Sequence, residues 1–340
     1  MMDDGNAARY PTLRCIVIDR EKTSLPPPPP PSTVGATIPH NENSTRAYAK
    51  RFRVFAFREF LLRTYFRPSS LSSSGGGNDG AAVVLDVAGG NGHLSWILRN
   101  ADGINSIVVD PVRPKHDRLI KSMNFLIDHP DEAALRSVEG LPTHQPLARL
   151  MPSLIENCER RDDRGRPIMT SPSYMRIRVD SKLVAMLRKV IVDGPSSGGD
   201  DALRSWDAYW YNESVNSANV PEEDGKSFAL SDDSQICDSR RALEVFRSVD
   251  LIVGFHPDQA TEAIIDMALL LRVPFAVVPC CVFPSEFPER TLGGKRVRIY
   301  SELVEYLRTK HDGIRTTTLP FIATEFARKL VMYMLMEDFK

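Results

Sequence analysis

The sequence predicts an α/β protein built around a mostly parallel sheet. Three observations lead to this class: short apolar runs recur along the chain, segments with helical spacing separate them, and a glycine-rich turn follows the first complete run. Strands that alternate with helices usually form a parallel sheet covered on both faces. The 340 residues, 42% hydrophobic and 26% charged, have the composition of a globular chain that is long enough for a large core.

The N-terminal part divides into a tail and a helix. Residues 1–45 are expected to be a disordered tail, because Pro26 to Pro31 form a six-proline run. A single domain is expected over 46–340, and it begins with a helix over 46–67 that Pro68 ends. Residues 68–80 have the composition of a flexible linker. Aromatic and apolar residues recur in the helix at three-, four- or seven-residue spacing: Tyr48, Phe52, Phe55, Leu62 and Phe66.

Residues 83–110 are expected to form a strand, a turn, a helix and a second strand. The helix covers roughly Leu94–Asn100, and the second strand covers Ile104–Val109 and ends at Asp110. His116–His129 has the spacing of a further helix.

Residues 131–245 are rich in charges, proline, serine and glycine, which predicts a long, partly disordered insertion. Within it, Met175, Ile177 and Val179 alternate with arginines, which indicates an exposed strand. Leu183–Val192 fits a short helix or a short strand.

Regular structure is expected again after Arg241. The predicted elements are a buried strand at Val249–Gly254, a helix at Pro257–Leu271, a strand at Phe275–Val278, a helix at Ser301–Lys310, and strands at Arg315–Leu319 and Leu330–Met336.

Composition limits the classes of partner and compartment. The formal net charge of −1 gives no global attraction to nucleic acid or to an anionic membrane, although a local basic patch is compatible with it. The five cysteines are odd in number and include no CxxC pair, so neither a disulfide framework nor a zinc finger is indicated. No apolar run reaches the roughly 20 residues of a membrane span, and the N-terminus has no apolar segment of a secretory signal. These features predict an intracellular protein, cytoplasmic or nuclear.

The turn Asp86-Val87-Ala88-Gly89-Gly90-Asn91-Gly92 is the main candidate for a ligand site. A glycine turn between a strand and a helix brings backbone N–H groups and a helix N-terminus next to a ligand. Asp110 follows 24 residues after Asp86, where an acid accepts hydrogen bonds from ribose hydroxyls. The alternative is a tight turn with an incidental acid. Nicotinamide cofactors and S-adenosylmethionine both use this arrangement.

The spacing Asp86-x-Ala88-x-Gly90-x-Gly92 resembles motif I of the class I S-adenosylmethionine-dependent methyltransferases, with Ala88 in place of the first glycine. The resemblance covers roughly 81–130 and 245–340. It implies a Rossmann-like sheet that ends in an antiparallel C-terminal strand pair, with S-adenosylmethionine as the cofactor. Asp86, Ala88, Gly89, Gly90, Gly92 and Asp110 are the implied cofactor-binding residues. Gly90 and Gly92 would line the methionine half, Asp110 would hold the ribose, and Asp86 would orient the turn. A third strand is also implied, and Leu135–Glu139 and Met175–Asp180 are its two candidates.

His256 and Asp258 follow directly on a predicted buried strand. Ligands in open α/β sheets bind at the carboxyl ends of strands, so both side chains are candidates to face the cofactor. Histidine is a common proton carrier, which makes His256 a candidate general base or positioning group with Asp258 in support. The alternative is that these residues only cap the following helix, which accounts for Asp258 but not for His256.

Cys280 and Cys281 follow the next predicted strand. Adjacent side chains of an extended chain point in different directions, so the two thiols are not expected to share a pocket. One of them is a candidate nucleophile at the cleft. Two small, buried and inert thiols are favoured, because no neighbour in the sequence stabilises a thiolate.

The histidine turn and the Cys-Cys turn together resemble a subgroup that includes tRNA 2′-O-methyltransferases and other methyltransferase-like proteins. Members of the tRNA family carry His-x-Cys-Gly where this chain has His256-Pro257-Asp258-Gln259, and they carry a zinc finger that is absent here. The resemblance and the arginine-rich helix 46–67 make RNA the expected acceptor. A helix that packs its aromatic face and leaves its arginines solvated is the alternative for 46–67, and a solvated edge is the alternative for Lys295–Arg298. A small-molecule or protein acceptor, and a non-catalytic sensor that binds the cofactor, remain alternatives. No metal is expected, and the oligomeric state is not predicted.

Overall fold

The computed structural model describes residues 42–66, 82–116, 119, 171–193, 199–218, 234–319 and 328–339, with side chains in the first segment from Arg53 onward. The expected linker at 68–80, the strand candidate at Leu135–Glu139 and nearly all of the helix expected at His116–His129 lie outside these residues. The expected tail also lies outside them except for its last four residues, because helix α1 (Glu42–Tyr65) begins at Glu42 rather than at residue 46.

Seven strands form the main sheet of the described residues, in the order β3-β2-β1-β4-β5-β9-β8. They are β1 (Val83–Val87), β2 (Asn105–Val109), β3 (Ser173–Met175), β4 (Leu251–Phe255), β5 (Phe275–Val278), β8 (Arg315–Thr318) and β9 (Leu330–Met334). The first five run parallel, whereas β9 is antiparallel to both β5 and β8. The prediction of a mostly parallel α/β sheet with an antiparallel C-terminal pair is confirmed, and the arrangement is Rossmann-like.

The central strands are apolar because helices cover both of their faces. Val84 and Leu85 are adjacent in β1 and point to opposite faces, yet both are fully buried. Val84 packs with α1 and α2 (His93–Asp102), and Leu85 packs with the helices of the other layer. This double burial explains why the strand sequences read as continuous apolar runs rather than as alternating ones.

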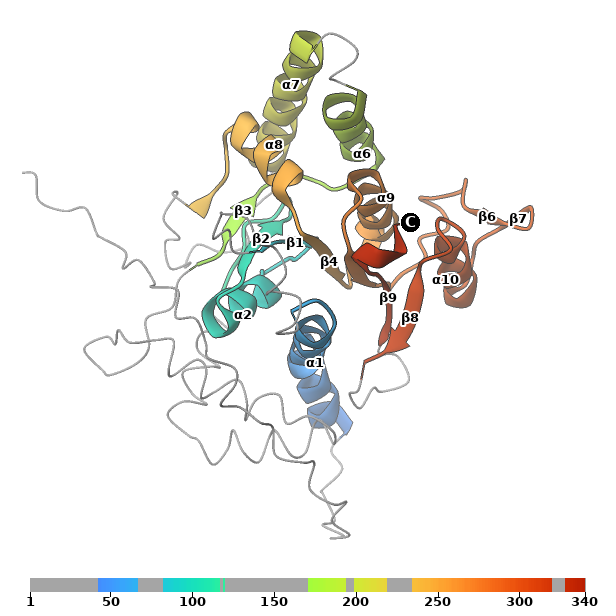
Figure 1. Ribbon diagram of the computed structural model, residues 1–340. Helices are drawn as coiled ribbons and strands as arrows, with labels where there is room; N and C mark the ends of the chain where they lie inside the picture. Colours follow the sequence, from blue (N-terminus) through green and yellow to red (C-terminus); the bar gives the residue numbers. More distant parts are fainter. Residues whose placement is uncertain are drawn as a thin grey trace, which may run out of the picture.

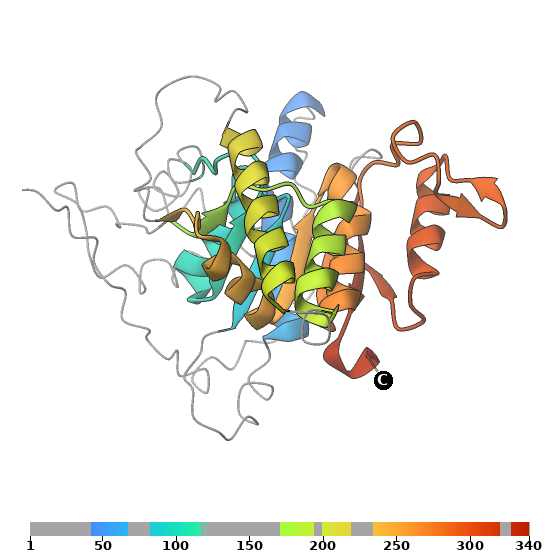
Figure 2. The same ribbon diagram turned by 90° about the horizontal axis from the view of Figure 1, so that it is seen from above.

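Figures 1 and 2 show the two helical layers around the sheet. Helices α1 and α2 cover one face, and α6 to α9 cover the other. The second layer consists of α6 (Ser181–Leu187), a π-helical turn (Arg188–Asp193), α7 (Gly199–Ala218), α8 (Ser239–Ser248), a 3₁₀ turn (Asp258–Ala260) and α9 (Thr261–Leu271). Asp180 and Asp238 begin α6 and α8 by accepting hydrogen bonds from backbone N–H groups of the first turn.

Tryptophan side chains belong to both layers. Trp96 of α2 is buried on one side of the sheet, and Trp206 and Trp210 of α7 are buried on the other. The indole nitrogens of Trp206 and Trp210 each donate to a backbone oxygen, of Ser239 and Cys237 respectively, at 2.7 Å. The indole rings therefore fill the second layer while their polar atoms stay paired.

Helix α1 packs its aromatic face against the sheet, as one of the two sequence interpretations expected. Phe55 and Phe57 are buried there. The companion expectation that the arginines of this helix are solvated is wrong for Arg58, which forms a two-point ion pair with Asp102 at the end of α2. Each of these two side chains is only 6% exposed. A guanidinium matches a carboxylate in two parallel bonds, so this pair joins the two helices of the layer.

The segment around β3 is part of the main fold. The prediction of an exposed strand at Met175, Ile177 and Val179 is wrong. All three side chains are buried, and the strand covers only Ser173–Met175. Helices α6 and α7 cover this segment, and Arg176 between the apolar residues donates to the backbone oxygens of Pro111 and Ser217. The observed strand β3 overlaps the candidate Met175–Asp180 only at Met175. The boundaries of the proposed insertion and the state of its other residues remain a prediction.

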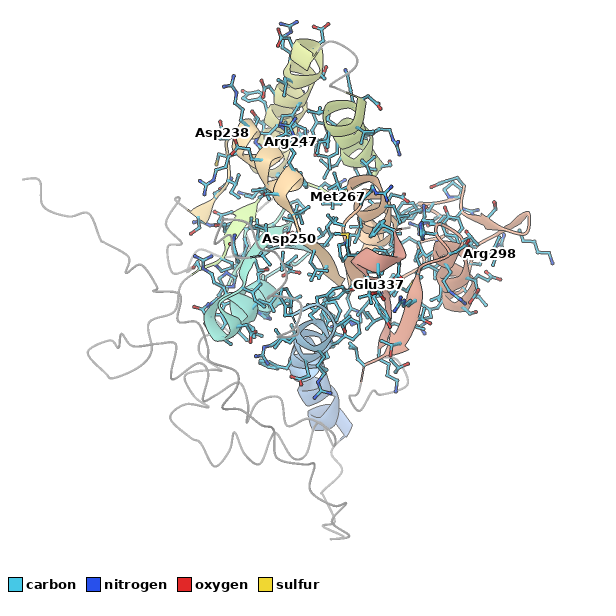
Figure 3. The ribbon with its side chains drawn as sticks, in the orientation of Figure 1. Asp238, Arg247, Asp250, Met267, Arg298 and Glu337 are labelled. Atoms are coloured by element: carbon cyan, nitrogen blue, oxygen red, sulfur yellow. The ribbon has the colours of Figure 1, made fainter. Side chains whose placement is uncertain are left out.

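The C-terminal part of the sheet carries an arm, formed by the hairpin of β6 (Thr291–Leu292) and β7 (Lys295–Arg296) and by α10 (Tyr300–Arg308). Figure 3 labels Arg298 on this arm, away from α1, and Met267 between α9 and the sheet. A final 3₁₀ turn covers Met336–Asp338. Among the described residues, no helix combines the length and the apolar character needed to cross a bilayer.

Candidate functional site

A cavity of about 1300 Å³ opens at the carboxyl ends of β1, β2, β4 and β5. It lies where the strand order reverses, between β1 and β4, which is the usual ligand position in an open α/β sheet. Its wall is formed by the segments that follow β1 to β5, by α1 and by the residues before β9. Its residues include Arg53, Ala88, Gly89, Gly90, Asn91, Asp110, Arg178, Asp180, Ser181, His256, Asp258, Cys280, Cys281 and Arg328. The cavity thus brings together the glycine turn, His256, Asp258 and both cysteines, which the sequence had placed on separate strand ends.

The glycine turn owes its shape to three left-handed residues. The φ angles are 52° at Ala88, 54° at Gly90 and 67° at Gly92. The Gly92 N–H donates to the oxygen of Gly89 at 2.8 Å, and the Ala88 N–H donates to the oxygen of Val109 at 2.8 Å. These bonds close the turn and fasten it to β2, and residues 88–91 of the turn line the cavity.

The three glycines of the turn are needed for two different reasons. A Cβ at residue 89 would lie 2.8 Å from the Oδ2 atom of Asp86, and a Cβ at residue 92 would lie 2.9 Å from His116 and Val108. A Cβ at residue 90 would meet nothing within 4 Å. Gly89 and Gly92 are therefore small because of the protein beneath them, whereas Gly90 leaves open the space that a ligand would fill.

Asp86 lies beneath the turn and is not part of the cavity wall. Its Oδ2 atom accepts hydrogen bonds from the Ser95 N–H at 3.2 Å and the Ser95 Oγ at 2.9 Å. The Ser95 hydroxyl also lies 2.9 Å from the Ser106 hydroxyl of β2. Asp86, Ser95 and Ser106 form a buried polar chain that links β1, α2 and β2. This placement supports the predicted role of Asp86 in orienting the turn.

The pKa of Asp86 is raised to about 7, chiefly because burial disfavours its charged form. The hydrogen bonds from Ser95 oppose this shift, and the nearby charge of Asp110 adds to it. Its Oδ1 atom is buried with no hydrogen-bond partner among the described residues.

Asp110 does face the cavity, as the sequence predicted. Its Oδ2 atom accepts from the Gly90 N–H and its Oδ1 atom accepts from the Val112 N–H, each at 2.8 Å. Burial raises the pKa of this carboxyl, and the two backbone hydrogen bonds oppose the shift. A carboxylate has about four lone-pair sites, so capacity remains for the hydroxyls of a ligand.

His256 stands at the end of β4 in a left-handed conformation, with φ of 57°. Its ring packs edge-on against Phe255, and its Nε2 atom is buried with no hydrogen-bond partner among the described residues. Burial first, and then the charge of Arg53, lower its pKa to about 4, while Asp258 opposes this. The ring is therefore neutral near pH 7, and the residue forms part of the cavity wall.

The alternative interpretation, in which the side chain of Asp258 caps the following helix, is wrong. The 3₁₀ turn and α9 begin without a side-chain cap, and Asp258 has φ of 47°. Its Oδ1 atom instead accepts a hydrogen bond from the thiol of Cys280 at 3.1 Å. Asp258 influences His256 through its charge, and it contacts Cys280 directly.

The two cysteines differ from the sequence expectation in two ways. They share the cavity, because the chain leaves β5 in an irregular loop and not as an extended strand. They are also not buried as expected, since Cys281 is exposed and Cys280 is partly exposed. Burial, and then the hydrogen bond to Asp258, raise the pKa of the Cys280 thiol. This shift supports the expectation that Cys280 is not a nucleophile by itself.

Several cavity residues were not predicted from the sequence. Asn91 lies within the quoted motif, but it carries no recognisable signal of its own. Arg53, Arg178 and Arg328 come from three distant segments, and only the folded sheet brings them to one rim. Asp180 and Ser181 follow the short strand β3, whose position the sequence left open.

The fold and the cavity define a Rossmann-like α/β protein with a large cleft at the switch point of its sheet. Comparison of the chain with known protein families, curated proteins and solved structures finds no match.

Ala88→Gly is expected to stabilise the protein by about 1 kcal/mol, because it removes the Cβ that strains a left-handed residue. The matched control is Ala101→Gly in the last turns of α2, where the same change lowers the free energy of unfolding by about 1 kcal/mol or more. Urea unfolding of both variants measures these values. A loss of stability in Ala88→Gly would show that the turn is not strained.

The second prediction concerns pH. Because the pKa of Asp86 is about 7 in the folded protein and near its ordinary value when unfolded, the folded state holds more protons between about pH 4 and 7. Stability from this group therefore falls as pH rises, by at most about 1.4 kcal/mol per pH unit. Asp86→Asn is expected to remove this slope in urea unfolding measured across the interval.

Asp250→Asn, which replaces an exposed carboxylate at the opposite end of β1, is the control for the loss of one acid. In this variant the slope of the unfolding free energy against pH is expected to lie closer to that of the wild type. Equal slopes in the wild type and Asp86→Asn would contradict the assignment.

Proposed function

We propose that this chain is an S-adenosylmethionine-dependent methyltransferase whose acceptor is RNA, methylated on a nitrogen or oxygen. The observation that carries the cofactor is the open space over Gly90, which adjoins both the N-terminus of α2 and Asp110. At about 1300 Å³ the cavity is larger than the roughly 300–1000 Å³ that a typical small-ligand pocket provides. A cofactor and part of an acceptor therefore fit together.

The charges around the turn favour a cationic ligand over a dinucleotide. The carboxyl group of Asp110 lies at the turn and that of Asp86 lies beneath it, and each attracts cations in its ionised form. The sulfonium and ammonium groups of S-adenosylmethionine would be attracted there, whereas a pyrophosphate would be repelled. In addition, a dinucleotide fingerprint has its third glycine three residues after its second, where this chain has His93.

The residues that would hold the cofactor follow from this placement. Ala88, Gly89, Gly90 and Asn91 line the methionine end, while Asp110 meets the ribose hydroxyls. Gly92 shapes the turn from below, and Asp86 orients it. Asp180 and Ser181, which follow β3 and line the same cavity, are the proposed contacts of the adenine.

When bound, S-adenosylmethionine supplies a methyl group that a nucleophile attacks in line with the carbon–sulfur bond, whose electron pair leaves on sulfur. The residues of the chain position the acceptor for this attack. Neutral His256, which lines the cavity, accepts a hydrogen bond from the attacking group at a ring nitrogen and takes up the proton that the acceptor loses. Asp258 favours the charged ring that results, since its negative charge raises the pKa of His256.

RNA is proposed as the acceptor because three arginines share the rim of the cavity. Arg178 and Arg328 are exposed, and Arg53 is partly buried with its guanidinium 5.7 Å from the Phe255 ring centroid. Guanidinium groups pair with phosphates in two-point bonds. Arg58 does not contribute, because it is committed to Asp102. The basic residues of β7 lie on the projecting arm and are not part of this rim.

Gly90→Ala is expected to weaken S-adenosylmethionine binding at least about 10-fold, because its Cβ enters the space left for the ligand. Gly293→Ala is a matched control. It too has a left-handed φ and open space around its Cβ, but it lies in the β6–β7 turn. Both variants carry the same backbone strain. Titration calorimetry with S-adenosylmethionine, and with NADH as the competing hypothesis, measures the difference.

Equal affinities in the two glycine variants, or binding of NADH in place of S-adenosylmethionine, would overturn the cofactor assignment.

His256→Ala is expected to retain the cofactor and to lose methyl transfer to RNA at least about 100-fold. The substitution keeps a Cβ, so the left-handed backbone of residue 256 is equally strained in both proteins. His311→Ala, in a histidine that packs against Phe339 outside the cavity, is the control. Transfer of labelled methyl groups to total RNA, to protein and to metabolite pools is measured for each.

Transfer to protein or metabolites alone would replace RNA as the acceptor. Binding without any transfer would indicate a sensor rather than an enzyme.

A further inference from the structure

We propose that Asp258, Cys280 and Cys281 form a zinc site with an open coordination position toward the cavity. The three ligand atoms, one carboxylate oxygen and two sulfurs, all lie within 4.8 Å of one another. They come from two loops, one after β4 and one after β5, that meet at the carboxyl edge of the sheet. All three residues line the cavity.

The distances suit the ion with little rearrangement. Zinc binds sulfur at about 2.3 Å and carboxylate oxygen at about 2.0–2.2 Å. Two sulfurs on one tetrahedral zinc are then roughly 3.8 Å apart. Atoms already within 4.8 Å of one another need to approach by at most about 1 Å. Cys280 Sγ and Asp258 Oδ1 are in contact at 3.1 Å, as two ligands of one ion would be.

The loop that carries the cysteines is held by buried contacts on both sides. The Arg290 guanidinium donates to the oxygen of Val282 at 3.1 Å and to Glu262 of α9 at 2.6 Å. Its own side chain is 3% exposed. On the other side of the cysteines, the Tyr300 hydroxyl donates to the oxygen of Pro279 at 3.3 Å. These contacts fix the loop that presents the two thiols. The loop is therefore already ordered, and little of the free energy of zinc binding is lost in ordering it.

The donor set selects the metal. Two thiolates favour zinc over magnesium or calcium, which take oxygen ligands. Three protein ligands with a fourth position open are typical of catalytic rather than structural zinc. On coordination each thiol releases its proton to solvent, and no electron is transferred. No spacing motif indicates this site, because its cysteines are adjacent and its acid lies 22 residues away.

The role of the site rests on the proposed methyltransferase function. The open position faces the cavity region that His256 also faces. It would take the nucleophilic atom of the acceptor, whose pKa the ion lowers and whose attack geometry it fixes. Binding of the ion itself does not depend on the proposed function and is measured separately.

The test uses the full-length, untagged chain after removal of metal. A reference protein, Cys15→Ser/Cys158→Ser/Cys237→Ser, keeps only the two cysteines of the proposed site among the five of the chain. Zn²⁺ is titrated in competition with a chromophoric chelator. We expect one ion per chain, with the reference protein binding as tightly as the wild type. Cys281→Ser and Asp258→Asn are each expected to weaken binding at least 10-fold.

Because Cys281 is exposed, its replacement leaves the fold intact, which thermal unfolding of the same samples checks. Co²⁺ in place of Zn²⁺ is expected to give a thiolate-to-metal charge-transfer band that Cys281→Ser reduces. An unchanged affinity in Cys281→Ser, or loss of binding in the reference protein, would overturn the zinc site. S-adenosylmethionine is titrated into the same metal-free protein. Failure of the zinc site with retained cofactor binding then leaves the proposed function standing, and the converse result leaves the zinc site standing.

Discussion

The hydrogen bonds between Asp86 and Ser95 hold the end of β1 to the first turn of α2, and the geometry of the cleft depends on them. The carboxylate occupies the space beneath residue 89, so only glycine fits there. The chain must then pass over it through left-handed residues, which turns the backbone of residues 88–91 toward the cavity. Ser106 extends the same contact to β2, and Asp110 at the end of β2 returns to bind Gly90. Hydrogen bonds between a few polar atoms thus hold β1, α2 and β2 in fixed positions beside the cavity.

The cost of this arrangement is a concentration of strained and unpaired groups on one side of the molecule. Among the described residues, five non-glycine residues have positive φ. Ala88, His256, Asp258 and Phe283 follow β1, β4 and β5, whereas Arg272 ends α9. Unpartnered buried atoms also occur near the same edge, in Asp86 of β1 and in His256. Strain of this kind persists only where the surrounding structure enforces it, and it gathers at sites of ligand binding or chemistry. Its location is a physical reason, independent of any motif, to place function at this edge.

The sequence was sufficient for the central strands and for the glycine turn, because both depend on local signals. Apolar runs marked β1, β2, β4 and β5, and glycine spacing marked the turn. The sequence was misleading where polar side chains form hydrogen bonds with residues that are distant in the chain. Arg176 made β3 look exposed, although backbone oxygens far along the chain receive its hydrogen bonds. Arg58 looked solvated because its partner, Asp102, is 44 residues away. The pairing of Asp258 with Cys280 likewise needs the alignment of two parallel strands, which no single segment encodes.

The placement of the indole rings has a practical consequence. The chain has three tryptophans, and Trp96, Trp206 and Trp210 are buried on the two faces of the sheet, with none on the wall of the cleft. Intrinsic fluorescence excited at the indole band therefore reports the integrity of both helical layers at once. A ligand that fills the cleft would quench none of these rings by contact. Contact quenching by a ligand in the cleft therefore does not distort the unfolding signal of the two helical layers.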